Sequence, residues 1–396
     1  MKVAFVTPRY GAEVIGGAES GARLLAEHLA ASGRAEVEVF STCALDARTW
    51  ANHYRPGTTS EGGVTVHRFA SKSVRHPDFD ARSQPVLAHP EAMSLEVCRR
   101  WILEQGPVCP DAVDAAAVSA NDVVAFYPYL YHPTVTGVPR LGRRAVMHPA
   151  AHDEAPLRLP IFHEVFGAAA GFVFQTEAER HLVEERFPAV AGAHQVLVGL
   201  GVDESPGTAE AARSRLAGRL ADGDPYLLCL GRVDRGKGTA ALARFFDAYK
   251  ARRPGPLALV FAGPVVHPIP SHPDIVMAGS VDEATKWGLL RGAEALVSPS
   301  GYESFSIVVN EAWAAGVPVM VNGLCGPTRE HCEISGGGLW YESYAGFEVA
   351  LDRLRQSPEL ASSMAQRGRA YVDARFRWSV IVDRYLAFCE RVARRG

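Results

Sequence analysis

One stretch of the sequence, residues 295–322, constrains the fold more than any other. It reads ALVSPSGYESFSIVVNEAWAAGVPVMVN. The pattern predicts a short apolar strand over 295–299, a polar turn at Gly301, a helix over 307–315 and a second apolar strand from Val317. A helix that connects two apolar strands is the repeating unit of parallel α/β sheets, so the chain is predicted to be an α/β protein.

Two glutamates flank the start of the predicted helix. Glu303 precedes it and Glu311 lies about one turn inside, while Ser304 and Ser306 between them are candidates to cap it. A helix start has unpaired N–H groups and the positive end of the helix dipole, so it binds phosphate readily. Glu311 lies roughly 6–8 Å further along, about the distance at which a ribose hangs from a diphosphate. We therefore expect a nucleotide-sugar as ligand; an ordinary crossover with solvated glutamates is the alternative.

A second candidate site follows the apolar run YLLCL, in the sequence GRVDRGKGTAALARFFDAY. Arg232 and Lys237 lie on the turn between this strand and an amphipathic helix. Such a pair can neutralise a leaving diphosphate, because arginine offers a two-pronged contact and lysine a point charge. Ligands of open α/β sheets bind at the carboxyl ends of the strands, where this turn belongs. A solvated basic turn is the alternative.

The chain opens with another β-α-β pattern, whose first loop contains Gly16 and Gly17. Two glycines at a helix start allow a ligand to approach the backbone closely. Their spacing is not G-x-G-x-x-G, so the fingerprint of NAD-binding proteins is absent. A plain tight turn is the alternative. Further along, residues 70–90 are polar, contain Pro77 and Pro85, and are predicted to form an irregular loop.

Two histidines with neighbouring carboxylates follow the strand predicted at 144–147. They are His148 and His152, with Asp153 and Glu154 behind them. A metal site is one interpretation, but Pro149 disfavours a helix that presents both rings on one face, and no third ligand has a recognised spacing. We therefore expect no metal.

These motifs together resemble those of the retaining glycosyltransferases of family 4. The resemblance rests on Glu303 and Glu311 with seven residues between them and AWAAGVPV behind them, on Arg232 and Lys237 in a "GR, four residues, KG" pattern, and on the Gly-Gly pair. It covers nearly the whole chain. It implies the GT-B architecture, in which two Rossmann-like domains face each other across a cleft. One departure is that Ser304 and Ser306 stand where the family usually has glycines.

The resemblance also implies roles for individual residues. Glu303 is expected to contact the donor sugar, Glu311 the ribose hydroxyls, and Arg232 and Lys237 the donor phosphates. His152, with Asp153 helping to orient it, is expected beside the donor sugar, and His148 is the fallback. The residues expected to be catalytic are His152, Glu303, Arg232 and Lys237. Those expected to bind the donor are Gly16, Gly17, Gly279, Val281, Ser304, Phe305, Ser306, Ile307 and Glu311.

The expected domains are residues 1–200, joined by a terminal helix at 377–396, on the acceptor side, and residues 201–376 on the donor side. The expected activity is that of a family 4 hexosyltransferase. It moves a sugar from a UDP- or GDP-sugar to a hydroxyl of a glycan, a glycolipid or a small metabolite, with retention and without metal or cofactor. A GT-B epimerase or phosphorylase and an inactive nucleotide-sugar-binding scaffold are the alternatives, and the four charged motif residues argue against the scaffold.

Composition excludes several other classes. The net charge of −3 gives no general attraction to nucleic acid. Seven scattered cysteines without a C-x-x-C pair indicate neither a disulfide framework nor a zinc knuckle. The first apolar run is too short for a signal peptide, and no apolar stretch is long enough to span a membrane. We expect a cytoplasmic protein with at most peripheral membrane contact through its basic end, RVARRG.

Overall fold

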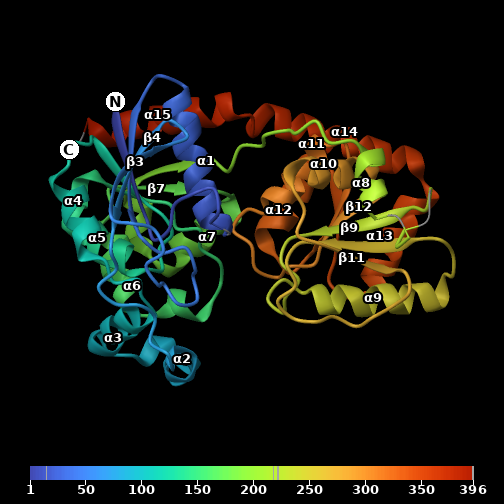
Figure 1. The fold of residues 1–396 in the computed structure, drawn as a ribbon, viewed down its shortest axis with the longest axis horizontal. Helices are drawn as coiled ribbons and strands as arrows, with labels where there is room; N and C mark the ends of the chain where they lie inside the picture. Colours follow the sequence, from blue (N-terminus) through green and yellow to red (C-terminus); the bar gives the residue numbers. More distant parts are fainter. Residues whose placement is uncertain (15, 217, 221–222, 395–396) are drawn as a thin grey trace. The chain divides into compact units, whose positions relative to one another are not determined.

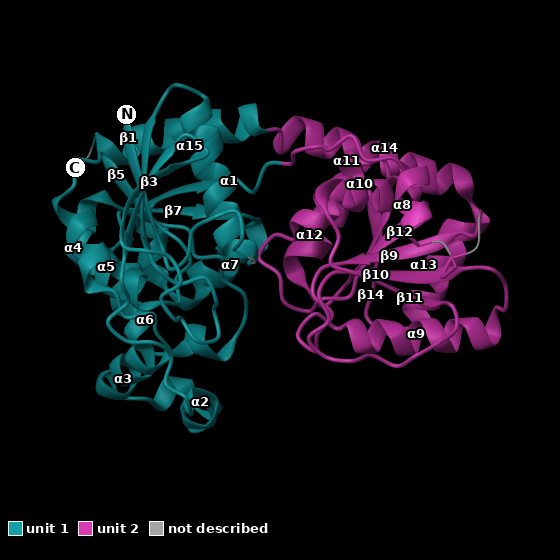
Figure 2. Ribbon diagram, in the orientation of Figure 1, with its two compact units in different colours: residues 1–201, 378–396 teal, residues 202–377 magenta. Residues whose placement is uncertain are grey.

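The structure is a computed structural model that describes residues 1–14, 16–216, 218–220 and 223–394. The chain divides into two compact units (Figure 2). Unit 1 comprises Met1–Gly201 and Trp378–Gly396, and unit 2 comprises Val202–Arg377. The sequence predicted domain boundaries after residues 200 and 376. In the structure the boundaries fall one residue later, after residues 201 and 377.

Unit 1 is built on a sheet whose order is β3-β4-β2-β1-β5-β6-β7-β8. Neighbouring strands are parallel except for β3 and β4, which form an antiparallel hairpin. The central strand β1 is buried from Val3 to Thr7, as expected of an apolar strand covered on both faces. The strands are β1 (Lys2–Thr7), β2 (Glu36–Thr42), β3 (Gly57–Glu61), β4 (Val64–Phe69), β5 (Val123–Phe126), β6 (Ala145–Met147), β7 (Gly171–Phe174) and β8 (His194–Leu197).

Helices connect most successive strands of unit 1 (Figure 1). They are α1 (Gly17–Ala31), α2 (Phe79–Ala88), α3 (Leu95–Gln105), α4 (Pro110–Val118), α5 (His132–Leu141), α6 (Ile161–Ala168), α7 (Glu177–Arg186) and α15 (Trp378–Ala393). Short 3-10 turns are η1 (Pro90–Ala92), η2 (Gly142–Arg144), η3 (Ala155–Arg158) and η4 (Pro188–Gly192). The terminal helix α15 packs against β8 and α1 within this unit.

Unit 2 contains an all-parallel sheet with the order β11-β10-β9-β12-β13-β14. Because the strands are parallel, their carboxyl ends lie along one edge, and the loops that follow them share that edge. The strands are β9 (Tyr226–Leu230), β10 (Ala258–Ala262), β11 (Ile275–Gly279), β12 (Ala295–Ser298), β13 (Val319–Asn322) and β14 (Gly338–Tyr341). The helices are α8 (Ala209–Arg215), α9 (Thr239–Arg252), α10 (Glu283–Gly292), α11 (Ile307–Ala314), α12 (Gly326–Ser335), α13 (Tyr344–Gln356) and α14 (Pro358–Arg375).

The stretch at 295–322 forms the predicted strand, helix and strand as β12, α11 and β13, and α11 ends at Ala314. Residues 70–90 differ from the expected irregular loop because they contain α2. This helix includes Pro85, yet tertiary contacts stabilise it: Phe79 packs on Trp101, whose indole N–H donates to Ser83 Oγ at 2.7 Å. Of the expected terminal helix, residues 395 and 396 lie outside the described part of the chain.

Candidate functional site

The loop between β9 and α9 places Arg232 and Lys237 at the carboxyl edge of the unit 2 sheet. Asp234, between them, organises this loop. Its Oδ1 accepts a hydrogen bond from the Lys237 backbone N–H at 2.8 Å, and its Oδ2 lies 3.2 Å from Arg232 Nη2. Its carbonyl oxygen accepts from Thr239 Oγ1 at 3.0 Å. Sequence reasoning missed Asp234, although an aspartate three residues before an N–H donor is typical of a side-chain-to-backbone turn.

Lys237 joins this loop to the loop that follows β12. Its Nζ lies 2.6 Å from Glu303 Oε1, and both side chains are partly buried. The two loops are neighbours because β9 pairs with β12. Gly238 makes the approach possible: its φ is 69°, and a Cβ there would lie only 2.5 Å from the Pro299 carbonyl oxygen. The structure therefore brings together two motifs that are 66 residues apart in the sequence.

The start of α11 has an unusual backbone. Ser306 occupies the N-cap position with φ 66° and ψ 75°, in the left-handed region. Its hydroxyl caps no N–H group, and it is buried without a hydrogen-bond partner among the described residues. Ser306, one of the two predicted caps, therefore does not cap this helix with its side chain. Phe305 is buried as well, and its ring packs edge-on against His331 and Phe376.

Glu311 is buried one turn inside α11 and pairs with a lysine that no motif indicated. Its Oε1 lies 2.7 Å from Nζ of Lys286, which belongs to α10 and also pairs with Glu283 at 2.8 Å. Burial raises the pKa of Glu311, and the lysine partly counters this. Burial alone lowers the pKa of Lys286, but attraction by Glu311 and Glu283 outweighs it, so the pKa rises above its usual value.

The remaining donor-site predictions in unit 2 lie on the same edge. Gly279 ends β11 with φ 70°, and its carbonyl oxygen accepts from the Gly263 N–H at 2.8 Å. Val281 follows on the short connection to α10, and Ile307 is the first residue of α11. The expected residues from the loops after β9, β11 and β12 thus gather along one edge of one sheet.

In unit 1, Gly16 and Gly17 lie at the start of α1. A buried ion pair, Arg9 with Glu19, lies directly against Gly16, and a Cβ on Gly16 would collide with the Glu19 carboxylate. A Cβ on Gly17 would meet nothing within 4 Å. The ion pair gives Gly16 a structural reason to be glycine, while Gly17 leaves open space at the helix start.

His152 lies on the loop after β6, where Glu154 is its carboxylate partner. His152 Nε2 lies 3.3 Å from Glu154 Oε2, and Glu154 Oε1 accepts from the Tyr129 hydroxyl at 2.7 Å. Asp153 instead pairs with Arg158 at 2.7 Å. That Asp153 helps to orient His152 stays a prediction, and Glu154 is a further carboxylate in contact with the ring.

A buried carboxylate fixes the backbone of this histidine loop. Glu179 Oε1 accepts from the Ala151 N–H at 2.8 Å, and Oε2 accepts from the Gln175 N–H at 2.7 Å. Thr176 caps α7, its side chain accepting from the Glu179 N–H. Burial raises the pKa of Glu179 to about 7. Sequence reasoning missed this role of Glu179, since nothing in the pattern places Ala151 beside it.

His148, the fallback histidine, is a core residue. It is 3% exposed, its Nε2 lies 3.1 Å from the Tyr385 hydroxyl of α15, and its ring stacks on Tyr127. Burial lowers its pKa to about 3, so it is neutral at physiological pH. Within unit 1, the structure leaves His152 as the histidine of this loop that solvent reaches.

The described residues include no group of three or more histidine, cysteine or acidic side chains arranged to hold a metal ion. All seven cysteines are buried and free. Across the described chain, every helix falls short of the length and apolarity that crossing a membrane requires.

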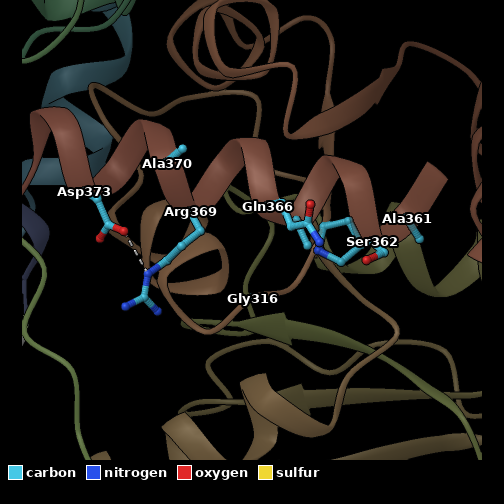
Figure 3. A pocket seen from close by; sticks show the side chains of 9 residues that line it. Gly316, Ala361, Ser362, Gln366, Arg369, Ala370 and Asp373 are labelled. Atoms are coloured by element: carbon cyan, nitrogen blue, oxygen red, sulfur yellow. Dashed lines mark hydrogen bonds and ion pairs between the residues drawn. The ribbon is translucent and has the colours of Figure 1, made fainter. Parts of the chain in front are cut away.

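A pocket of about 540 Å³ lies beside α14, away from the loops described above (Figure 3). Its charged residue Arg369 already pairs with Glu204 at 2.8 Å and with Asp373 at 3.3 Å. The guanidinium also donates to the Ala314 carbonyl oxygen. Because its cation is engaged by protein groups, this pocket does not compete with the loop edge as the candidate site.

Comparison with known proteins places these features in a class. Residues 212–371 match the family described as Glycosyl transferases group 1. Two curated proteins, both named D-inositol 3-phosphate glycosyltransferase, come from Segniliparus rotundus and Saccharomonospora viridis; they are 29% and 28% identical over 208 and 246 residues. These alignments cover 48% and 56% of this chain and 44% and 56% of the two proteins. The chain thus spans about half the length of the curated relatives it matches.

Solved structures resemble the chain over its full length. Sucrose-phosphate synthase from Thermosynechococcus elongatus has a TM-score of 0.71 and 17% identity, covering 100% of both chains. Anabaena HepE in complex with UDP and glucose has a TM-score of 0.66 and 15% identity, covering 99% of this chain and 100% of that one. The fold is therefore the GT-B fold, with two Rossmann-like α/β units, and residues 212–371 are similar to the group 1 glycosyltransferases.

Proposed function

We propose that this chain is a retaining, metal-independent glycosyltransferase of family 4. It transfers a sugar from a UDP- or GDP-sugar to a hydroxyl of an acceptor. The observation that carries the proposal is the 2.6 Å contact between Lys237 and Glu303, which joins the basic turn to the loop before α11. A phosphate-binding group and a sugar-binding carboxylate side by side are what a sugar diphosphate requires.

The chemistry follows from charge. As the bond between sugar and diphosphate breaks, negative charge grows on the leaving phosphate. Arg232, Lys237 and the N–H groups at the start of α11 stabilise that charge without a metal ion. Without ligand, Glu303 neutralises Lys237 at 2.6 Å; with ligand, the ammonium is shared with the phosphate while Glu303 turns to the sugar hydroxyls.

The relatives guide the choice of donor and acceptor. HepE is named as a complex with UDP and glucose, and the curated relatives are named for a phosphorylated inositol acceptor. UDP-glucose and small phosphorylated polyols are therefore the first ligands to try, with GDP-sugars, glycans and glycolipids next.

The proposal is tested with a thermal-shift panel of nucleotide-sugars, followed by calorimetry with the nucleoside diphosphate that binds. A ligand at 100 times its dissociation constant adds about 2.7 kcal/mol to stability. Arg232→Ala and Lys237→Ala should each weaken the binding of the diphosphate by about 1.5–3 kcal/mol. Arg244→Ala, on α9 away from the turn, is the control and should bind normally.

Unchanged affinity in both variants would refute the phosphate role. Release of nucleotide from the nucleotide-sugar, undiminished by a chelator and with the anomeric configuration retained in the product, supports the proposed enzyme. Binding without any turnover across the acceptor panel supports the inactive scaffold instead.

A further inference from the structure

Lys286 lies on α10 and belongs to none of the sequence motifs, yet it covers Glu311. Its Nζ is 2.7 Å from Glu311 Oε1 and 2.8 Å from Glu283 Oε2. The side chain of Glu311 is 8% exposed, that of Lys286 19% and that of Glu283 71%. The ammonium group therefore joins a buried carboxylate to an exposed one, and Lys286 itself is partly exposed.

The carboxylate of Glu311 is only half satisfied. Oε1 is paired with Lys286, whereas Oε2 is buried and has no hydrogen-bond partner among the described residues. A buried oxygen in this state is costly, so a hydroxyl group that donates to it stabilises the site. The terminal torsion of a glutamate is broad, so a modest rotation can present Oε2 to a hydroxyl group.

Lys286 is also only partly used. An ammonium group has three N–H donors, and the two carboxylates take two of them. The third is available to an oxygen atom of the ligand. Lys286 and Glu311 together thus offer one donor and one acceptor at adjacent positions.

We infer that Lys286 and Glu311 jointly bind the vicinal diol of a ribose, with one hydroxyl donating to Glu311 and the other accepting from Lys286. A vicinal diol is the chemical group that satisfies both at once, since each hydroxyl can donate and accept. Lys286 is then a specificity residue that selects ribonucleotides over deoxyribonucleotides. This inference rests on the proposed function, because it places a nucleotide at the start of α11.

The competing explanation is that Lys286 only neutralises the buried Glu311. Calorimetry separates the two with the nucleoside diphosphate that binds, UDP or GDP, and its 2′-deoxy and 3′-deoxy analogues. The proteins are the wild type, Lys286→Met, Glu311→Gln and the control Glu283→Gln, which removes only the exposed partner of Lys286. Lys286→Gln replaces Lys286→Met if the latter fails to fold by circular dichroism.

We expect the wild type to bind each deoxy analogue at least about tenfold more weakly than the ribonucleotide. Lys286→Met should bind one deoxy analogue as well as it binds the ribonucleotide, and should still bind the other deoxy analogue more weakly. Glu311→Gln should become insensitive mainly to the loss of the other hydroxyl. Glu283→Gln should bind all three ligands as the wild type does.

The inference is wrong if Lys286→Met binds all three ligands more weakly by the same factor, because the protein then still distinguishes the ribonucleotide from both deoxy analogues. It is also wrong if Lys286→Met and Glu311→Gln become insensitive to the same hydroxyl. Equal binding of all three ligands by the wild type also overturns it while leaving the proposed function intact. A wild type that binds no nucleoside diphosphate refutes the proposed function itself, which keeps the two failures distinct.

Discussion

A histidine can act on a ligand only if the ligand reaches its ring. His148 and His152, four positions apart, differ in this respect. His152 is 33% exposed and held by Glu154, whereas His148 is enclosed by Tyr127 and Tyr385. Replacing His148 would therefore remove a core contact and give no information about catalysis. Glu154 is the better comparison, because it touches His152 without sharing its chemistry.

We predict that His152→Ala lowers the release of nucleotide from the nucleotide-sugar by about 100-fold or more, if the ring acts near the reacting carbon. Donor affinity should change by no more than about twofold, since a contact strengthened in the transition state affects turnover more than binding. Steady-state kinetics with calorimetry measures both. Glu154→Gln, which keeps the shape of the partner, should have a smaller effect. A His152→Ala protein with normal turnover would remove this residue from the site.

Most charged residues of the candidate site could be predicted from the sequence, but one could not. Arg232, Lys237, Glu303 and Glu311 were expected because each lies at a recognisable point of a strand-turn-helix pattern. Lys286, the partner of Glu311, was not expected, because this contact depends on how α10 packs against α11 in the fold. Periodicity along the chain carries no information about that packing.

Among the elements, α11 has the most unusual start, since Ser306 adopts φ 66° without using its hydroxyl. A side chain in the left-handed region is disfavoured, and glycine is not. We predict that Ser306→Gly raises the free energy of unfolding by about 0.5–1 kcal/mol. Urea denaturation followed by circular dichroism measures this.

Ser304 provides the matched control, because it is not among the residues with positive φ in the described chain. Ser304→Gly should therefore destabilise the protein slightly through the added freedom of the unfolded chain. If both glycine variants are destabilised equally, the backbone at Ser306 is not strained.

Helices and strands that repeat along the α/β pattern were predictable because they are apolar or amphipathic at a clear period. Other helices were not, and α2 and α12 show why. In α2, Pro85 and a polar composition conceal a helix that exists through the contacts of Phe79 and Ser83 with Trp101. In α12, the sequence GPTREHCEIS has few apolar residues, and its buried face consists of polar or small side chains such as His331. Both depend on tertiary packing rather than on local pattern.

At the scale of the whole molecule, three histidines of the described residues are buried in their neutral form: His132 and His148 in unit 1, and His331 in unit 2. Burial lowers their pKa values to about 4, 3 and 4. A lowered pKa in the folded state means that the unfolded chain binds protons more readily. The stability these groups contribute is present above about pH 6.5 and is lost as the pH falls towards the folded values. Glu179, whose pKa is raised to about 7, acts in the opposite direction.

We predict that the wild type loses stability between pH 7 and pH 5, and that His148→Gln loses about 2 kcal/mol less over the same interval. Glutamine cannot titrate, yet it can still bond the Tyr385 hydroxyl. Urea denaturation at the two pH values measures the difference, which does not depend on the absolute stability of the variant. An identical loss in both proteins would show that His148 is protonated without cost in the folded state.

The chain crosses between the two units twice, and this has a consequence for synthesis on the ribosome. Unit 2 is one continuous segment whose ends meet, since the Val202 N–H donates to the Phe376 carbonyl oxygen at 3.0 Å. It can fold as soon as residue 377 has left the exit tunnel. Unit 1 lacks α15 until then, and α15 supplies Trp378 against His28 and Tyr385 against His148. Although domains of a nascent chain generally fold from the amino terminus, here the unit that is translated first is the unit that is completed last.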